Sequence, residues 1–145
     1  MRLVSVECEN FRQYKNLKLT FPKSSDFDIH VIEASNGVGK TNLLNAINWC
    51  LYGDEPHRSG MLQRDVEQNY SDDSNRLPLY NIEVFKEYGC EGKTICKVVV
   101  SVVLDIDGEQ YTFKRTREFK VPSGVSFGKE VIECSKKTSR ILFVF

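Results

Sequence analysis

The sequence predicts one α/β domain built around a glycine-rich, phosphate-binding loop, and three observations predict it. The stretch from residue 28 to residue 44 has the order apolar strand, glycine-rich loop, helix. On either side of this stretch, apolar and polar residues alternate, which is typical of half-buried strands. The chain has 145 residues, of which 41% are apolar and 28% charged, and these values suit a single folded domain.

The glycine-rich loop has the residue types that a P-loop needs. Ile29, Val31 and Ile32 predict a short buried strand, and Lys40 and Thr41 begin a helix. Glycines permit a close backbone approach, so successive amide N–H groups can surround a phosphate at the positive end of the helix dipole. We therefore predict that Lys40 contacts the β- and γ-phosphates of ATP and that the Thr41 hydroxyl binds Mg²⁺.

One position departs from the full pattern, which is G-x-x-x-x-G-K-[S/T]. The first glycine of this pattern is replaced by Ala34. The added methyl group can be absorbed where φ is negative, but it narrows the loop. A chance glycine turn between a strand and a helix is the alternative. The apolar strand before the loop and the amphipathic helix after it favour the P-loop.

The helix after the loop is predicted to run from about residue 40 to residue 52. Glycine is favoured just after a helix, and Gly53 occupies that position. Trp49 is expected to pack in the core. The predicted apolar face of the helix consists of Leu43, Leu44, Ile47, Cys50 and Leu51.

The segments on either side of the P-loop predict antiparallel strands. Residues 3–8 and 17–21 alternate and predict a hairpin. The β-branched run at 97–106 predicts a strand buried on both faces. A turn at 105–108 leads from it to a return strand at 110–117. Two further strands, at 130–134 and 141–145, complete a predicted β meander.

Residues 54–81 are polar and acidic with poor periodicity, so they predict a surface insertion with a short helix somewhere in 61–70. The five cysteines are odd in number and irregularly spaced, which favours reduced structural thiols. The sequence shows no secretory signal and no apolar run long enough for a membrane span. A cytoplasmic protein without a membrane partner is therefore expected.

Charge is unevenly distributed along the chain, although the formal net charge is zero. From Tyr111 to Phe145 there are eight basic and three acidic residues, a difference of 8 − 3 = +5. Such a face can meet a phosphate backbone, with Arg115 and Arg117 facing DNA. A solvated strand surface with cationic side chains guarding an edge explains the same charges, and the sequence leaves both interpretations open.

Three elements, in order, resemble the ABC-type ATPases related to structural-maintenance-of-chromosomes (SMC) proteins. This group includes SbcC-type exonuclease ATPases, RecF-type repair proteins and DndD-type ATPases. The N-F-[R/K/G] element of the family is matched by Asn10-Phe11-Arg12. The helix end at 46–53 is similar to A-h-x-x-x-L-Y-G, and residues 108–115 are similar to the hairpin strand G-x-x-[Y/F]-x-[I/F]-x-R.

The resemblance implies lobe I of an ABC-type ATPase head, with an antiparallel sheet beside a core sheet that holds the P-loop. Residues 1–26 would form the hairpin, 27–53 the P-loop strand and helix, 54–96 the polar insertion, and 97–145 the meander. It also implies that Arg12 lies near the nucleotide phosphates. The implied nucleotide-binding residues of the loop are Ser35, Asn36, Gly37, Val38, Gly39, Lys40, Thr41 and Asn42.

Several motifs of such a head are missing from these residues. No glutamine follows Gln110 to serve as a Q-loop, and there is no signature motif, Walker B Asp-Glu pair or switch histidine. The family hydrolyses ATP only between two heads, so this chain is expected to supply one wall of the site, without a catalytic residue, and to be inactive alone. We expect the N-terminal part of a longer protein, or one half whose other half is a separate chain.

The resemblance therefore implies an ATPase module acting on DNA, in repair, recombination or defence against foreign DNA. Its implied partners are a second ATPase head, identical or different, DNA, and a nuclease or other effector subunit. A module that binds ATP without turnover and serves as a nucleotide-sensing scaffold is the alternative. A small P-loop kinase is less favoured, because the chain opens with an antiparallel hairpin and shows no acceptor-site motif.

Overall fold

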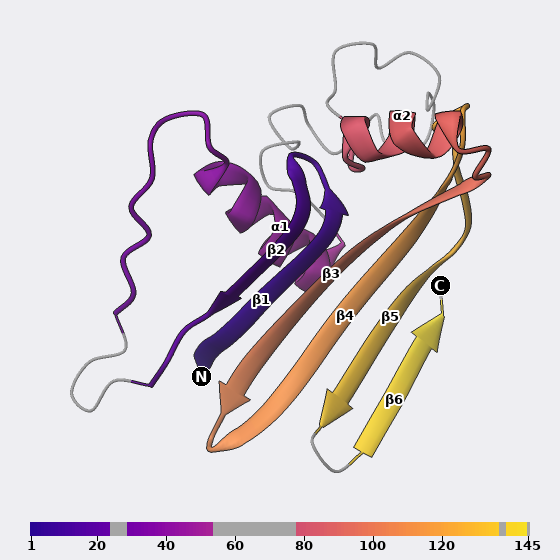
Figure 1. The fold of residues 1–145 in the computed structure, drawn as a ribbon. Helices are drawn as coiled ribbons and strands as arrows, with labels where there is room; N and C mark the ends of the chain where they lie inside the picture. The colour runs from indigo at the N-terminus through magenta and orange to yellow at the C-terminus, as the bar shows by residue number, and fades with distance from the viewer. Residues whose placement is uncertain (24–28, 54–77, 137–138, 145) are drawn as a thin grey trace, which may run out of the picture.

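The computed structural model describes residues 1–23, 29–53, 78–136 and 139–144. Their strands form one six-stranded antiparallel sheet in the order β2-β1-β3-β4-β5-β6 (Figure 1). The elements are β1 (Arg2–Phe11), β2 (Tyr14–Thr20), α1 (Lys40–Tyr52), α2 (Ile82–Cys90), β3 (Ile95–Ile106), β4 (Glu109–Lys120), β5 (Ser126–Lys136) and β6 (Ser139–Val144).

The predicted N-terminal hairpin is present, but its strands are longer and its turn is tighter than the sequence suggested. Phe11 of β1 pairs with Tyr14 of β2, so Arg12 and Gln13 form the whole turn. Arg12 has a φ of +49°, in the left-handed region that such tight turns use. The hairpin therefore places the side chain of Arg12 at one tip of the sheet.

The predicted meander is also present, and its first turn follows local turn chemistry. Asp107 and Gly108 connect β3 to β4 with φ values of +54° and +85°, as the Asp-Gly pair favours in two-residue hairpins. The Gly108 N–H donates to the carboxylate of Asp105 at 3.1 Å. The hairpin and the meander join into one sheet because β1 pairs with β3, for example at Val6 and Val102.

The core lies between one face of this sheet and α1. Four side chains at alternate positions of β3 are fully buried there, namely Cys96, Val98, Val100 and Val102. The prediction that this strand is buried on both faces is wrong, because Val99 and Val103 on the opposite face are only half buried. Among the described residues, α1 packs against only one of the two sheet faces.

Helix α1 begins and ends at the predicted residues. Gly53 follows it with a φ of +76°, and its N–H donates to the carbonyl of Trp49. Trp49 packs in the core against Phe11 with ring centres 5.8 Å apart, as expected. The buried face of the helix differs from the predicted apolar face. Leu44, predicted to be on that face, is 58% exposed, while Ala46, which was not, is fully buried. The helix turns its small Ala46 to the sheet, which permits a close approach.

The segment before the loop does not form the predicted buried strand. Residues 29–35 have no regular structure, and Ile29 and Val31 are 77% and 87% exposed. In Figure 1 this segment lies beyond the edge strand β2, away from the sheet. A strand is stabilised by neighbouring strands, and among the described residues no β-strand pairing or β-bridge involves residues 29–35. The centre of the His30 ring lies 5.2 Å from that of Phe21, but the apolar side chains of Ile29, Val31 and Ile32 stay exposed.

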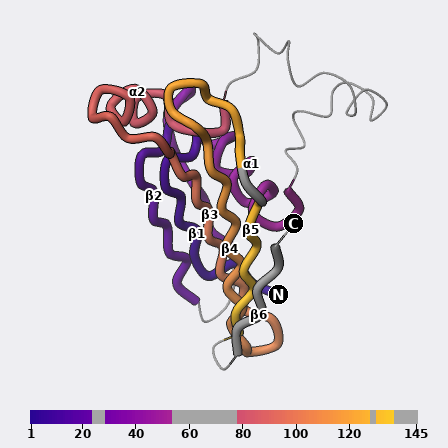
Figure 2. Tube along the Cα trace, turned by 90° about the vertical axis from the view of Figure 1, so that its right-hand side faces the viewer, coloured from indigo at the N-terminus to yellow at the C-terminus, as the bar shows by residue number. Residues whose placement is uncertain are grey.

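Helix α2 was not predicted. Its N-cap is Asn81, whose side chain accepts from the Val84 N–H at 3.0 Å, and Glu83 lies in its first turn. It lies at the end of the sheet where β4 turns into β5 (Figures 1 and 2). The predicted short helix at 61–70 and most of the predicted insertion lie outside the described residues. No helix in the described part is long and apolar enough to cross a bilayer.

Candidate functional site

The P-loop residues form an open turn that leads directly into α1. Gly37 has a φ of +85° and Gly39 a φ of +110°, both in the region that favours glycine. A side chain added at Gly37 would have no atom within 4 Å, so the loop is open at that point. Helix α1 begins at Lys40, and therefore its unpaired first-turn N–H groups lie next to the loop.

The ammonium group of Lys40 lies within the P-loop and contacts its backbone. It donates to the carbonyl oxygen of Ser35 at 3.0 Å and to that of Ala34. Lys40 and Thr41 are both exposed. A phosphate at this position would offer the ammonium stronger, charged acceptors than the two carbonyls. The structure thus places the Lys40 ammonium at the loop carbonyls, with Thr41 exposed next to it in the first turn of α1.

The tip of the N-terminal hairpin packs against the same loop. The Tyr14 hydroxyl donates to the carbonyl of Gly39 at 2.8 Å. Burial raises the pKa of the Tyr14 phenol, which further favours the protonated form that donates this hydrogen bond. Asn42 in the first turn of α1 donates to Gln13 and accepts from Arg12 at 3.4 Å. The contacts of Gln13 and Tyr14 were not predicted.

A second connection fixes the hairpin tip from the other side. The Arg12 N–H donates to the Leu79 carbonyl at 2.8 Å, and the Asn81 N–H donates to the Asn10 carbonyl at 2.8 Å. Asn10 is itself 5% exposed. A cavity of about 290 Å³ lies beside these contacts and next to α1. Its lining consists of Arg12, Gln13, Asn42, Pro78, Tyr80, Asn81, Ile82 and Glu83.

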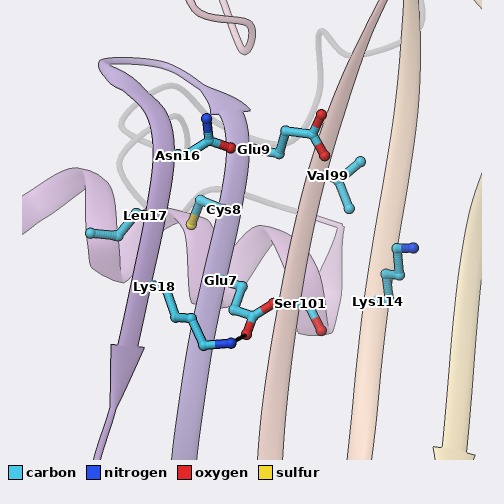
Figure 3. A pocket seen from close by; sticks show the side chains of 9 residues that line it. All are labelled: Glu7, Cys8, Glu9, Asn16, Leu17, Lys18, Val99, Ser101 and Lys114. Carbon is cyan, nitrogen blue, oxygen red and sulfur yellow. Dashed lines mark ion pairs between the residues drawn. The ribbon is translucent and has the colours of Figure 1, made fainter.

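A larger hollow, of about 590 Å³, lies elsewhere, on the face of the sheet opposite α1 (Figure 3). Its floor is formed by β1 and β3, and α1 passes behind these strands. Two carboxylates, Glu7 and Glu9, and two lysines, Lys18 and Lys114, line it, and Glu7 pairs with Lys18 at 2.7 Å. Its opposite charges balance, and neither a glycine-rich loop nor a helix start lines it, in contrast to the P-loop.

The structure does not place Arg115 as the sequence suggested. It is 6% exposed and faces α1, and its guanidinium pairs with Glu130 at 2.6 Å. Arg117 pairs with the other oxygen of Glu130 at 2.5 Å. The burial and the pairing argue against Arg115 as a surface contact for DNA. Lys136 is likewise paired, with Glu109 at 2.6 Å, so the solvated, ion-paired surface explains these charges better.

The buried thiols do not offer a nucleophile. Burial raises the pKa of Cys8 and of Cys50 to about 12, and the Sγ of Cys50 lies 3.3 Å from the Val100 carbonyl. A thiol with such a pKa stays protonated at neutral pH. All five cysteines are free, as expected. In the described part of the chain, no cluster of His, Cys, Asp and Glu could hold a metal ion.

A glycine-rich loop opening a helix, with a lysine and a threonine at the helix start, defines the class of P-loop nucleoside triphosphatases. The chain belongs to the family described as "AAA domain", whose model matches residues 5–143. This membership confirms the predicted P-loop ATPase domain, and the described elements show the mixed α/β structure with an antiparallel sheet.

One curated relative is the "DNA replication and repair protein RecF" of Clostridium kluyveri, which is 31% identical over 106 residues. The match covers 68% of this chain and 28% of that protein, so the chain spans about a quarter of the relative's length. One similar solved chain comes from work on ATP-driven dimerization and DNA-stimulated activation of SMC ATPases. It is 18% identical with a TM-score of 0.49, and the match covers 97% of this chain and 72% of that one.

Proposed function

We propose that this domain binds MgATP at the P-loop and forms one wall of an ATPase site in a DNA-repair protein. The observation that carries the proposal is the convergence of the open glycine loop, the Lys40 ammonium and the first turn of α1. Backbone amides at a helix start bind phosphate through both hydrogen bonds and the helix dipole. The proposed loop contacts run from Ser35 to Asn42.

The proposed binding step replaces contacts that the loop makes with itself. The ammonium of Lys40 would leave the carbonyls of Ala34 and Ser35 for the β- and γ-phosphates. Thr41, exposed beside it, has the hydroxyl that Mg²⁺ accepts as a ligand, and the remaining ligands would be phosphate oxygens and water. This ion would neutralise phosphate charge when bound.

Arg12 extends the proposed site beyond the loop. Its guanidinium reaches Asn42 in the first turn of α1, and it lines the cavity of about 290 Å³ beside the loop. A nucleotide whose phosphates occupy the loop would place its sugar or base near this cavity. The cavity is lined by Tyr80 and by several amide groups, which suit a planar, polar ring.

The function beyond nucleotide binding is proposed from family membership and from the matched relative. That relative is named for DNA replication and repair, which supports a role on DNA and favours repair over defence. We propose that hydrolysis requires a second head, because the chain contains no Walker B Asp-Glu pair, signature motif or candidate general base. An effector subunit such as a nuclease, and a cytoplasmic location, remain part of this proposal.

The exposed residues before the P-loop, 29–33, support the proposal that another part of the protein or a partner chain completes the site. Ile29 and Val31 are almost fully exposed, although their pattern is that of a buried strand. We propose that a neighbouring strand from the rest of the protein or from a partner covers them. Hydrogen exchange at residues 29–33 should then slow in the complete assembly. Equally fast exchange in the assembly and in the isolated chain would contradict this step.

The test of nucleotide binding is a titration with a fluorescent ATP analogue and Mg²⁺. Lys40→Ala should abolish binding, because the variant lacks the cation of the loop. The matched control is Lys93→Ala, which removes an exposed lysine paired with Glu91 at 2.8 Å, away from the loop. If Lys40→Ala bound the analogue as tightly as the parent, the P-loop assignment would be wrong.

A nucleotide-sensing scaffold is the second candidate function, and it is favoured by Ala34 at the first glycine position of the pattern together with the missing catalytic motifs. Turnover separates the two. ATP hydrolysis by the full-length protein that rises more than linearly with its concentration would support a two-head ATPase. Saturable binding without hydrolysis at any concentration, with DNA present, would instead support the scaffold.

A further inference from the structure

Arg115 on β4 makes a buried contact with the end of α1 that lies opposite the P-loop. Its Nε donates to the carbonyl of Cys50 at 3.0 Å, in the last turn of the helix. Its guanidinium carbon lies 5.9 Å from the centre of the Trp49 ring. The side chain is 6% exposed. It is therefore a buried cation placed at the C-terminal end of the helix that begins at the P-loop.

The C-terminal end of a helix is where such a cation stabilises most. The last carbonyls have no partner within the helix, and the helix dipole gives this end a partial negative charge. Gly53 leaves room for the guanidinium, since a side chain added there would come within 2.9 Å of Nη1 of Arg115. Glycine at position 53 therefore has two effects: it permits the positive φ that ends α1, and it leaves space for the Arg115 guanidinium.

The guanidinium is held equally firmly from the side of the sheet. Its Nη1 pairs with Oε1 of Glu130 on β5 at 2.6 Å, and the other oxygen of Glu130 accepts from Arg117 at 2.5 Å. A continuous path of charged hydrogen bonds therefore runs from the Cys50 carbonyl through Arg115 to β5. Arg117 shares the same carboxylate, and its bond to Glu130 does not extend to α1.

We propose that Arg115 is a positioning residue for the nucleotide site, and this inference rests on the proposed function. By holding the C-terminal end of α1 to β4 and β5, it fixes where the N-terminal end presents Lys40 and Thr41. A helix of 13 residues is a rigid rod about 20 Å long, so an axial shift at one end appears at the other. Arg115 acts through the helix and does not touch the nucleotide.

The test compares Arg115→Gln with Arg117→Gln in the full-length protein, using a fluorescent ATP analogue with Mg²⁺. Arg115→Gln should weaken binding roughly tenfold, because a helix correctly placed for about a tenth of the time reduces apparent affinity by that fraction. Arg117→Gln also removes one positive charge that is paired with Glu130, but this charge does not contact α1. It should change the affinity less than about twofold. Arg115→Lys should recover part of the loss, since one ammonium cannot reproduce the two-sided fork.

A second measurement separates positioning from loss of folding. Hydrogen exchange of the amides at residues 49–53 should quicken in Arg115→Gln and not in Arg117→Gln, with circular dichroism showing all variants folded at the assay temperature. Should Arg115→Gln fail to fold, Glu130→Gln, which keeps the side-chain size, should show an intermediate loss of affinity.

The outcomes distinguish this inference from the proposed function. A parent protein that fails to bind the analogue overturns the proposed function and the inference together. A parent that binds, with Arg115→Gln binding equally well, overturns only the positioning role. An equal loss of affinity in Arg117→Gln and Arg115→Gln also overturns it, because the effect would then come from charge and not from contact with α1.

Discussion

Replacing Gly39 by alanine should damage the P-loop more than the same change at Gly37. Both residues have a positive φ, which costs an L-residue roughly 1–2 kcal/mol. At Gly37 nothing lies within 4 Å of the added carbon, so that cost is the whole effect. At Gly39 the carbon would lie 2.6 Å from the Tyr14 hydroxyl, and Gln13 is also in the way.

The extra cost at Gly39 can be worked out from the contacts that must break. Tyr14 has to move, which breaks its hydrogen bond to the Gly39 carbonyl, worth about 1 kcal/mol. Gln13 can turn aside, but it then loses its contact with Asn42. We therefore expect Gly39→Ala to lower the free energy of unfolding by about 2–3 kcal/mol, against about 1–2 kcal/mol for Gly37→Ala.

Urea unfolding followed by circular dichroism measures both variants against the parent. A titration with the ATP analogue should show a larger loss of affinity for Gly39→Ala, because the shifted hairpin also moves Arg12. Gly37→Ala is the matched control, since it introduces the same methyl group two residues away. Equal destabilisation by the two changes would refute the packing of the hairpin tip on the loop.

Two further predictions concern the core and the thiols. Val100→Ala should lower the free energy of unfolding by about 2 kcal/mol because Val100 is fully buried, whereas Val99→Ala, on the open face, should cost less than about 1 kcal/mol in the same urea titration. Because burial raises the pKa of Cys50 from 9.0 to about 12, the unfolded chain loses this proton first, so stability should fall as the pH rises from about 9 towards 12. The decrease in stability over this pH range should be smaller in Cys50→Ala, and an equal decrease in the variant and the parent would contradict the raised pKa of Cys50. Iodoacetamide at pH 8 should modify the exposed Cys90 before Cys50, as peptide mass spectrometry would show.

Elements with strong local signals were predictable from the sequence. Helix α1 combines an amphipathic pattern with Gly53 after its last residue, and both of its ends were predicted. The Asp107-Gly108 turn is specified by residues that tolerate a positive φ, so the β3–β4 hairpin was predictable as well. Helix α2 had the weaker signals of Asn81 and Glu83 at its start, within a polar segment that hid them.

Features that depend on distant parts of the chain were not predictable. The pattern of Ile29 and Val31 is that of a buried strand, but burial requires neighbours that a local pattern does not supply. In the same way, the dense apolar run in β3 did not reveal that only one of its faces is covered, so Val99 was expected inside. The pairing of β1 with β3 also joins residues nearly a hundred positions apart.

The candidate site shows the same division. The loop and the helix start were predicted from the two glycines and the Lys-Thr pair that follow one another before an amphipathic helix. The resemblance indicated Arg12, which the structure brings to Asn42. Gln13 and Tyr14 contact the loop only because the turn of the hairpin is two residues long. The sequence suggested a longer polar turn there, and a longer turn would have carried these side chains away.

The arginines of β4 show why a charge count is a weak guide to partners. Counting gave an excess of basic residues after residue 110, but the count does not record where each charge points. Arg115 faces the core because it alternates with exposed positions along β4, and burial of a cation requires a carboxylate, which Glu130 supplies. An arginine that is buried at a helix end and paired in this way acts within the protein. Whether DNA meets the domain must therefore be decided at its exposed lysines, whose removal should flatten the salt dependence of DNA binding if they contact phosphates.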